Sequence, residues 1–233
     1  MTIRATYRLQ LHPKFGFAEA EALADYLADL RVSHVYLSPV LQAAPGSTHG
    51  YDVVDHAHLN AELGGDVAHQ RMSETFARRG LSQVLDLVPN HMAIGTPANR
   101  WWWDVLENGP ASRFASYFDV DWNASGSSDD RILVPVLGDH FGRVLEAGDI
   151  KVALEDRRFV VRYFDNVFPA SPRSLGPVLA DAAERCGNDH LAFLAEAFER
   201  LPHLYAKDRE DARRRHREKE VLNRLLDGWM ADE

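Results

Sequence analysis

The stretch that decides the fold is Gln83-Val84-Leu85-Asp86-Leu87-Val88-Pro89-Asn90-His91-Met92. Its apolar run, residues 84–88, is typical of a strand buried on both faces. Pro89 has no backbone N–H to donate, so it fits the exit of a strand better than its middle. The sequence therefore predicts a buried strand that ends abruptly in polar residues.

Three polar side chains in this stretch are candidate site residues. Asn90 and His91 follow the strand, at the end where parallel sheets and barrels collect their functional groups. Asp86 lies inside the run, where a carboxylate needs a cation or several donors. A strand with one hydrogen-bonded aspartate and a polar loop explains this stretch equally well.

Size and composition bound the class of protein. The chain has 233 residues, of which 45% are hydrophobic, and a net charge of −9, which argues against nucleic acid or an anionic membrane as partner. Its one cysteine, Cys186, excludes an internal disulfide framework and favours a reducing compartment. No apolar window reaches the roughly 20 residues of a membrane span. We expect a soluble cytoplasmic protein.

The first part of the chain repeats a strand-and-helix pattern. Strands are predicted at residues 6–11 and 34–40, with a helix from Phe17 to Leu30 between them. A second helix ends at Gly80, and the stretch quoted above follows it. Short links in this order predict parallel strands and right-handed crossovers.

Residues 41–65 form a long polar connection, which we expect to be an ordered functional loop. After His91 the pattern changes. An aromatic segment precedes a flexible turn at Ser125–Asp130, and short strands are predicted at 132–137, 144–146, 151–154 and 159–163. From Pro172 onward the pattern is helical.

Two further groups of residues are candidate sites. Tyr51 offers a flat face with a polar tip, which suits a sugar ring but also suits packing within a loop. A metal cluster is conceivable in the same loop, but its spacing matches no zinc or calcium pattern, so we expect no metal there. Its members are Asp52, Asp55, His56 and His58.

Two other features stand out by composition. Trp101, Trp102 and Trp103 cannot all face one core, so at least one is expected to meet another domain, a partner or a ligand. The basic run at residues 213–217 is flanked by acidic residues, which is typical of a solvated helix face. No nucleophile elbow, P-loop or dinucleotide-binding fingerprint is present, so no cofactor is expected.

The motifs of this sequence resemble those of the α-amylase superfamily. Residues 86–91, Asp-Leu-Val-Pro-Asn-His, are similar to its first conserved region, at the end of the third strand of a (β/α)₈ barrel. Gly50-Tyr51-Asp52 resembles the loop after its second strand, and the segment after His91 resembles its domain B. Within the superfamily, residues 5–170 resemble the maltooligosyltrehalose synthase family. Trp101-Trp102-Trp103-Asp104 through Pro110 is the most specific part of that resemblance.

The resemblance implies an α/β fold: the first three βα units of a TIM barrel at residues 1–91, an inserted β-rich domain B at 92–170, and a helical segment of that insertion at 171–233. It also implies an isomerase that acts on maltooligosaccharides or other α-1,4-glucans. The reducing-end α-1,4 bond becomes an α,α-1,1 trehalose bond by intramolecular transglucosylation. Such a retaining mechanism needs two carboxyl groups about 5 Å apart.

In the family those carboxyl groups follow the fourth and fifth strands. The resemblance therefore implies that none of the catalytic residues lies in this chain, and that the chain alone is inactive. Tyr51 would stack on the glucose at the cleavage site, His91 would bind its hydroxymethyl group, and Asn90 and Asp52 would complete the substrate-binding set. Asn90 and Asp86 would support an arginine outside the chain, and we expect Asp86 to face an empty socket here.

Two functional classes stay open at this point. One is the N-terminal portion of a synthase, with the remaining part supplied by a second polypeptide. The other is a non-catalytic glucan-binding or interaction protein. Because a three-stranded sheet leaves two edges unpaired, self-association is also expected.

Leu9, Leu37 and Leu85 are predicted to point into the barrel interior.

Overall fold

The computed structural model describes residues 2–122, 132–203 and 209–231. The chain forms two compact units, Met1–Arg100 and Trp101–Glu233. The predicted turn at Ser125–Asp130 lies outside the described residues.

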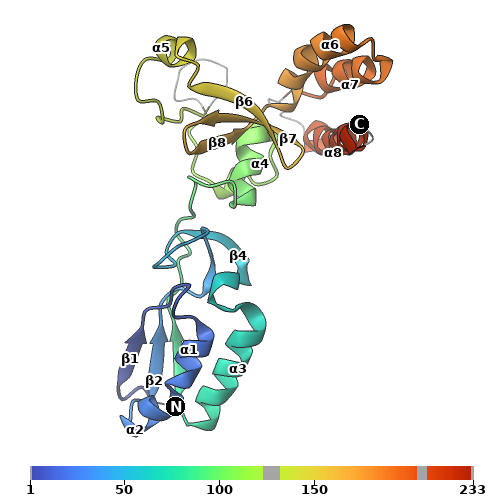
Figure 1. Ribbon diagram of the computed structural model, residues 1–233. Coiled ribbons are helices and arrows are strands. Elements are labelled where there is room, and N and C mark those ends of the chain that lie inside the picture. The colour runs from blue at the N-terminus through green and yellow to red at the C-terminus, as the bar shows by residue number, and fades with distance from the viewer. Residues whose placement is uncertain (1, 123–131, 204–208, 232–233) are drawn as a thin grey trace. The chain divides into compact units, whose positions relative to one another are not determined.

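The first unit is built on a three-stranded parallel sheet in the order β1-β2-β5 (Figure 1). Its strands are β1 Thr6–Leu9, β2 His34–Leu37 and β5 Ser82–Leu85. The predicted parallel order of the first three strands is confirmed, although each strand is shorter than predicted. In the register, Arg8 lies beside Tyr36, and Tyr36 lies beside Val84.

Helices cover one face of this sheet (Figure 1). They are α1 Phe17–Ala22, α2 Ala24–Asp29 and α3 Gly65–Arg78. Leu9 and Leu37 belong to the core formed with these helices, so the prediction that they point into a barrel interior was wrong. Because side chains alternate along a strand, Arg8 and Tyr36 lie on the opposite face. The core on the helix side includes Leu9, Phe17, Leu27, Val35, Leu37, Met72 and Phe76.

The first predicted helix is two helices in the structure. Its backbone breaks at Leu23, where φ is −85° and ψ is −1°, and the Leu23 N–H donates to Ala20 O at 3.1 Å. A bond to the third preceding carbonyl tightens the turn and ends an α-helix. The apolar spacing survives the break, because Ala20, Ala24 and Leu27 remain buried.

Strand β5 is less buried than predicted. Leu85 is 42% exposed and Leu87, just after the strand, is 59% exposed, whereas Val88 is buried. The reason is that β5 is an edge of the sheet: among the described residues it pairs with β2 alone.

The long segment after β2 is a hairpin with an ordered loop. β3 Leu41–Ala43 pairs antiparallel with β4 Val53–Leu59, and a short 3₁₀ turn, η1 Ala61–Leu63, leads into α3. The prediction of an ordered connection is confirmed, but most of it is regular structure. The loop proper is residues 44–52.

In the second unit, an antiparallel sheet follows the order β6-β7-β8. Its strands are β6 Ile150–Glu155, β7 Arg158–Tyr163 and β8 Asn166–Pro169. The strands predicted at 151–154 and 159–163 are confirmed, and β8 was missed. Asp156 and Arg157 both have positive φ, which gives the two-residue turn typical of tight hairpins.

Two other predicted strands of this unit are wrong. Residues 144–146 belong to a helix, α5 Phe141–Glu146, where Arg143 pairs with Asp139 one turn earlier at 3.4 Å. Residues 132–137 form no strand, since Pro135 cannot donate to a ladder and no strand pairs with them among the described residues.

The remaining elements of the second unit are helical. They are α4 Arg100–Asn108, α6 Leu175–Cys186, α7 Asp189–Glu199 and α8 Arg209–Ala231, with short 3₁₀ turns η2 Gly109–Ala111, η3 Ala115–Tyr117 and η4 Pro172–Ser174. Leu179, Leu194, Phe198, Leu222 and Leu226 are among their shared core residues.

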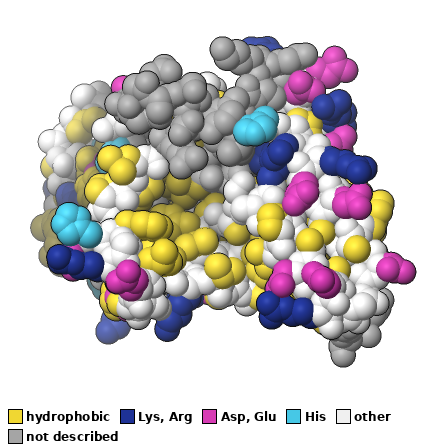
Figure 2. Space-filling model, turned by 90° about the horizontal axis from the view of Figure 1, so that it is seen from above, with side chains coloured by type: hydrophobic (Ala, Val, Ile, Leu, Met, Phe, Trp, Pro, Cys, Tyr) yellow, Lys and Arg dark blue, Asp and Glu magenta, His cyan; other side chains and the backbone are white. Residues whose placement is uncertain are grey.

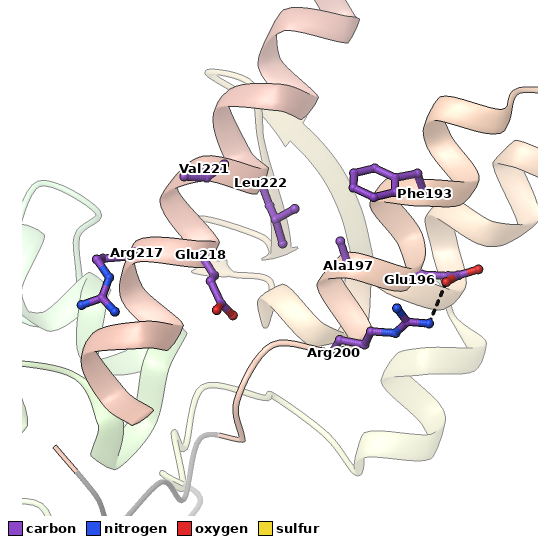
Figure 3. A pocket seen from close by; sticks show the side chains of 8 residues that line it. All are labelled: Phe193, Glu196, Ala197, Arg200, Arg217, Glu218, Val221 and Leu222. Atoms are coloured by element: carbon purple, nitrogen blue, oxygen red, sulfur yellow. Dashed lines mark hydrogen bonds and ion pairs between the residues drawn. The ribbon is translucent and has the colours of Figure 1, made fainter. Parts of the chain in front are cut away.

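Helices α7 and α8 leave a groove of about 590 Å³ between them, into which Phe193, Ala197 and Leu222 point (Figure 3). At its rim Glu196 pairs with Arg200 at 2.9 Å.

One face of the molecule also carries hydrophobic side chains in a hollow with charged side chains around it (Figure 2). Among the described helices, none is long and apolar enough to cross a bilayer.

The basic run at residues 213–217 was predicted to be a solvated helix face, but part of it is buried. Arg215 is 1% exposed and Lys219 is 3% exposed. Both lie on the buried stripe of α8, at helical spacing from Leu222 and Leu226. That spacing was visible in the sequence and was the signal that the prediction overlooked.

Candidate functional site

Asp86 continues the line of β5 past the last residue of that strand. Its backbone N–H donates to Leu37 O at 3.1 Å, which extends the ladder between β5 and β2 by one bond. Because Asp86 is two residues beyond Val84, its side chain lies on the same face of the sheet as Val84 and Tyr36. This is the face opposite the helices.

Two tyrosines meet at the Asp86 carboxylate. The Tyr51 hydroxyl donates to Asp86 Oδ2 at 2.6 Å, and the Tyr36 hydroxyl is also hydrogen-bonded to the carboxylate. Arg8 Nη2 donates to Tyr51 Oη at 3.2 Å, and the Arg8 guanidinium lies 5.7 Å from the centre of the Tyr36 ring. The expectation that Asp86 faces an empty socket is therefore wrong, because side chains of the same unit satisfy it.

Asp86 changes the pKa of the neighbouring Tyr36. The hydrogen bond to Asp86 raises the pKa of Tyr36, and burial and the nearby Asp86 charge act in the same direction. A carboxylate disfavours a second negative charge, so the phenol stays protonated. Tyr36 therefore remains a hydrogen-bond donor at neutral pH.

The loop that carries Tyr51 is held by its own polar residues. Asp52 accepts a short bond of 2.5 Å from Ser47 Oγ and lies 3.7 Å from His49 Nδ1. The Gly50 N–H donates to Ser47 Oγ at 3.0 Å, and the Tyr51 N–H donates to His49 Nδ1 at 3.0 Å. The Asp52 carboxylate thus contacts residues of its own loop in this structure.

The segment after β5 contacts the same loop. His91 Nε2 lies 3.1 Å from Tyr51 O, and the Ala93 N–H donates to Val53 O at 2.9 Å. Asn90 is exposed beside them. Of the predicted site residues, the structure thus links Tyr51, Asp86 and His91 directly and holds Asp52 in the adjoining turn.

These groups suit a neutral, hydroxyl-rich ligand. Tyr51 is 36% exposed, and its ring stacks with His49 at a centroid distance of 6.1 Å and an interplanar angle of 28°. An aromatic face next to carboxylate, imidazole and amide groups is the combination that binds a sugar ring and its hydroxyl groups.

The acidic and histidine-rich residues of β4 pair with one another. Burial disfavours the charge on Asp55, but the Ala57 N–H and His58 outweigh that effect and lower the pKa of Asp55. His56 instead lies 3.0 Å from Val88 O through Nε2. Across the described ranges, no group of three or more potential ligands is arranged to hold a metal ion.

Sequence reasoning missed Arg8, Tyr36 and His49. Arg8 and Tyr36 lie inside predicted strands, and register would have been needed to see that they share a face with Asp86. Strand alternation alone already placed them opposite the core residues Leu9 and Leu37. His49 lies two residues before Tyr51, and nothing in its spacing indicated a contact.

Trp101 and Trp102 pack against aromatic residues of the second unit. Trp102 is buried against Phe118, with ring centroids 5.0 Å apart. Trp101 stacks with Phe114 at 5.4 Å and with Tyr117 at 5.3 Å. Two of the three indoles therefore have aromatic neighbours close in sequence, as a helix followed by short 3₁₀ turns allows.

Comparison with known proteins identifies the family of the chain. The family model of the alpha-amylase catalytic domain matches residues 21–137, about half of the chain. The chain belongs to the alpha-amylase family.

Within that family, the similar proteins include maltooligosyltrehalose synthases. A Mycobacterium tuberculosis protein named as a maltooligosyl trehalose synthase is 48% identical over 140 residues, covering 58% of this chain and 18% of the relative. The intracellular maltogenic amylase of Bacillus subtilis is 33% identical over 96 residues, which are 41% of this chain and 16% of that protein.

Two solved structures give the same picture. The maltooligosyltrehalose synthase from Arthrobacter ramosus is 40% identical with a TM-score of 0.64, over 72% of this chain and 21% of the other. The crystal structure of a Sulfolobus tokodaii protein described as a hypothetical maltooligosyl trehalose synthase is 37% identical with a TM-score of 0.65, over 79% of this chain and 24% of the other. The chain thus spans about a fifth of the length of these relatives.

Gly50 sets the position of Tyr51, and its substitution gives a first test. Gly50 has φ of +78°, and a Cβ there would lie 2.9 Å from Pro39 O. We expect Gly50→Ala to lower the free energy of unfolding by about 2 kcal/mol or more, because backbone strain and a backbone clash add. Gly46→Ala is the matched control: φ is +76° with nothing within 4 Å, so about 1 kcal/mol is expected. Equal losses in urea unfolding would contradict the close approach to Pro39.

The Tyr36–Asp86 contact predicts a shift in a tyrosine titration. In Asp86→Asn the charge that opposes ionisation is gone, so the pKa of Tyr36 should fall toward its usual value of about 10. Ultraviolet difference titration against a Tyr36→Phe background isolates this group. Asp52→Asn, which removes a carboxylate held by Ser47, should leave Tyr36 unchanged. An unchanged pKa in Asp86→Asn would show that the carboxylate does not control Tyr36.

Proposed function

We propose that this chain is the N-terminal portion of a maltooligosyltrehalose synthase. The reaction moves the reducing-end glucose of a maltooligosaccharide within one molecule: an α-1,4 bond breaks and an α,α-1,1 bond forms, with no net consumption of water. The observation that carries the proposal is the identity of 48% with a relative of that name. The site supports it, because the Tyr51, Asp86 and His91 contacts suit a neutral sugar.

The fold supports a division of the chain into three parts. Residues 1–91 supply the first three strands of a (β/α)₈ barrel, of which β1, β2 and β5 are parallel and adjacent. Residues 92–170 form an inserted domain B, in keeping with the antiparallel strands β6 to β8. Residues 171–233 are the helical segment of that insertion. In a closed barrel, β1 and β5 each gain a further neighbour.

Each predicted site residue has a role in this proposal. Tyr51 presents its ring to the glucose at the cleavage site, and Asp86 fixes the tilt of that ring through the 2.6 Å bond to its hydroxyl. His91 binds the hydroxymethyl group with the ring nitrogen that does not contact Tyr51 O, and Asn90 lies exposed next to it. Asp52 reaches the sugar only by leaving Ser47, so we assign it the weaker contact.

We place the catalytic carboxylates outside these 233 residues. Asp86 and Asp52 are both occupied by hydroxyl groups of this chain, which supports a binding role rather than a nucleophilic one. A retaining mechanism needs two free carboxyl groups about 5 Å apart. The single cysteine is in keeping with a reducing, cytoplasmic location.

The decisive experiment supplies the rest of the barrel. Purified chain with maltopentaose should give no trehalose-terminated product, because it lacks nucleophile and acid/base. Co-expression with the matching remainder of a related synthase should restore product.

Tyr51→Ala in that complex should lower kcat/KM by about tenfold or more, because it removes the stacking surface at the cleavage site. Tyr26→Ala, an exposed tyrosine of α2, is the control.

Product formed by the isolated chain would overturn the assignment of the carboxylates to the other part. A folded, glucan-binding complex that never forms product would favour a non-catalytic glucan-binding protein instead.

The open sheet predicts self-association of the isolated chain. In the first unit, β1 and β5 each pair on one side alone among the described residues, and Leu85 and Leu87 at the β5 edge are exposed. Unpaired strand edges template association. Light scattering should show a mass that rises with concentration, and co-expression with the remainder should abolish that rise. A monomer at all concentrations, with one cooperative urea transition, would show that the edges are protected.

A further inference from the structure

A second pocket lies wholly within the second unit, between the α4–η3 segment and the start of α8. Its volume is about 670 Å³, which is in the range of small-molecule sites. It shares no residue with the Tyr51 site.

The pocket is strongly cationic although the chain as a whole carries a net charge of −9. Five arginines contribute to its wall, and one carboxylate, Asp104, opposes them. Asp104 is already engaged: Ser112 Oγ donates to it at 2.5 Å and Asn108 Nδ2 at 3.0 Å. The arginines of the wall are Arg113, Arg209, Arg213, Arg215 and Arg217, and His216 also lines the pocket.

Arg215 is the residue that indicates a ligand. It is 1% exposed, and its Nη1 donates to Pro202 O at 2.6 Å. Its Nε and Nη2 have no hydrogen-bond partner and each expose less than 1 Å². Leaving buried donors of a charged group unpaired costs several times a typical hydrogen bond.

The neighbouring carboxylates do not hydrogen-bond to Nε or Nη2 of Arg215, because they pair with Lys219. Lys219, one turn along α8, is 3% exposed and lies 2.5 Å from Glu107 and 3.9 Å from Asp104. Arg215 feels these charges only at longer range. Burial lowers the pKa of Arg215 to about 10, so the guanidinium is still cationic at pH 7.

The two unpaired nitrogens define the kind of group that would complete the site. Nε and Nη2 are adjacent donors on one edge of the guanidinium, the arrangement that binds two oxygens of a carboxylate or phosphate at once. The surrounding arginines favour the more highly charged of these, since a phosphate monoester carries close to two negative charges at pH 7. Because both nitrogens are buried, the side chains around them must move to admit the ligand.

We propose that the pocket between α4 and α8 binds a small molecule that carries a phosphate monoester, with Arg215 as the central anchor and Arg209 and Arg213 at the entrance.

The test uses the 233-residue chain and inorganic phosphate as the probe, by isothermal titration at constant ionic strength with chloride. Saturable binding is expected. Arg215→Gln should weaken it about tenfold or more, as expected for loss of a charge-assisted pair. Arg214→Gln is the matched control, because Arg214 pairs with Asp211 and Glu218 and does not line the pocket, so a change below twofold is expected.

Arg215 is buried, so a second variant guards against a folding defect. Arg209 and Arg213 are exposed, and replacing both by Gln should weaken phosphate binding several-fold while the circular dichroism spectrum stays unchanged. The proposal is overturned if the chain binds no phosphate saturably, or if the Arg209→Gln/Arg213→Gln variant binds it as tightly as the unmodified chain. Acetate that competes as well as phosphate would overturn the choice of a phosphate group.

Discussion

The carboxylate of Asp86 is the constraint on which the first unit's polar face depends. It lies at the end of a parallel strand, on the side of the sheet without helices, where a charge must find donors within the protein. Tyr51 and Tyr36 supply those donors, and Arg8 contacts both tyrosines. Through Tyr51 the same carboxylate holds the loop at residues 44–52, and through that loop it holds His91. One charged group thus links three strands and two connections.

This arrangement explains how a site can be preformed on the three-stranded sheet of the first unit. The core that positions β1, β2 and β5 lies on the helix side, with Phe17, Met72 and Phe76 fully buried. The opposite face is polar and is held by hydrogen bonds instead of apolar packing. Under the proposed function, the side chains that bind the substrate on that face are therefore ordered without the catalytic carboxylates.

Particular residues show which parts of this structure the sequence predicts and which it does not. Apolar runs and short links were enough for the three parallel strands, because these signals are local. The break at Leu23 was not predictable from spacing, since buried positions keep their period across it. Pro135 should have argued against a strand at 132–137, and the three residues 144–146 were too few to distinguish strand from helix. In the site, Tyr51, Asp86 and His91 carried sequence motifs, whereas Arg8 and Tyr36 needed strand register.

The second unit shows a related limit. In the run at residues 213–217, flanking acids suggested a solvated face, and only the spacing to Leu222 and Leu226 shows that Arg215 and Lys219 turn inward. Lys219 finds Glu107, a residue far away in sequence, so no local pattern could have paired them. Arg215 finds one carbonyl and is otherwise unsatisfied, which is why its surroundings form the basis of a separate binding proposal.

A double-mutant cycle between Tyr51 and Asp86 tests the central claim most directly. The free energies of unfolding of Tyr51→Phe, Asp86→Asn and the double variant would be compared with that of the unmodified chain, and a Tyr26→Phe/Asp86→Asn cycle serves as control. A coupling of about 0.5–1.5 kcal/mol is predicted for Tyr51 and Asp86, and none for the control. Additive effects of Tyr51→Phe and Asp86→Asn would mean that Asp86 does not hold the loop, and would contradict the account.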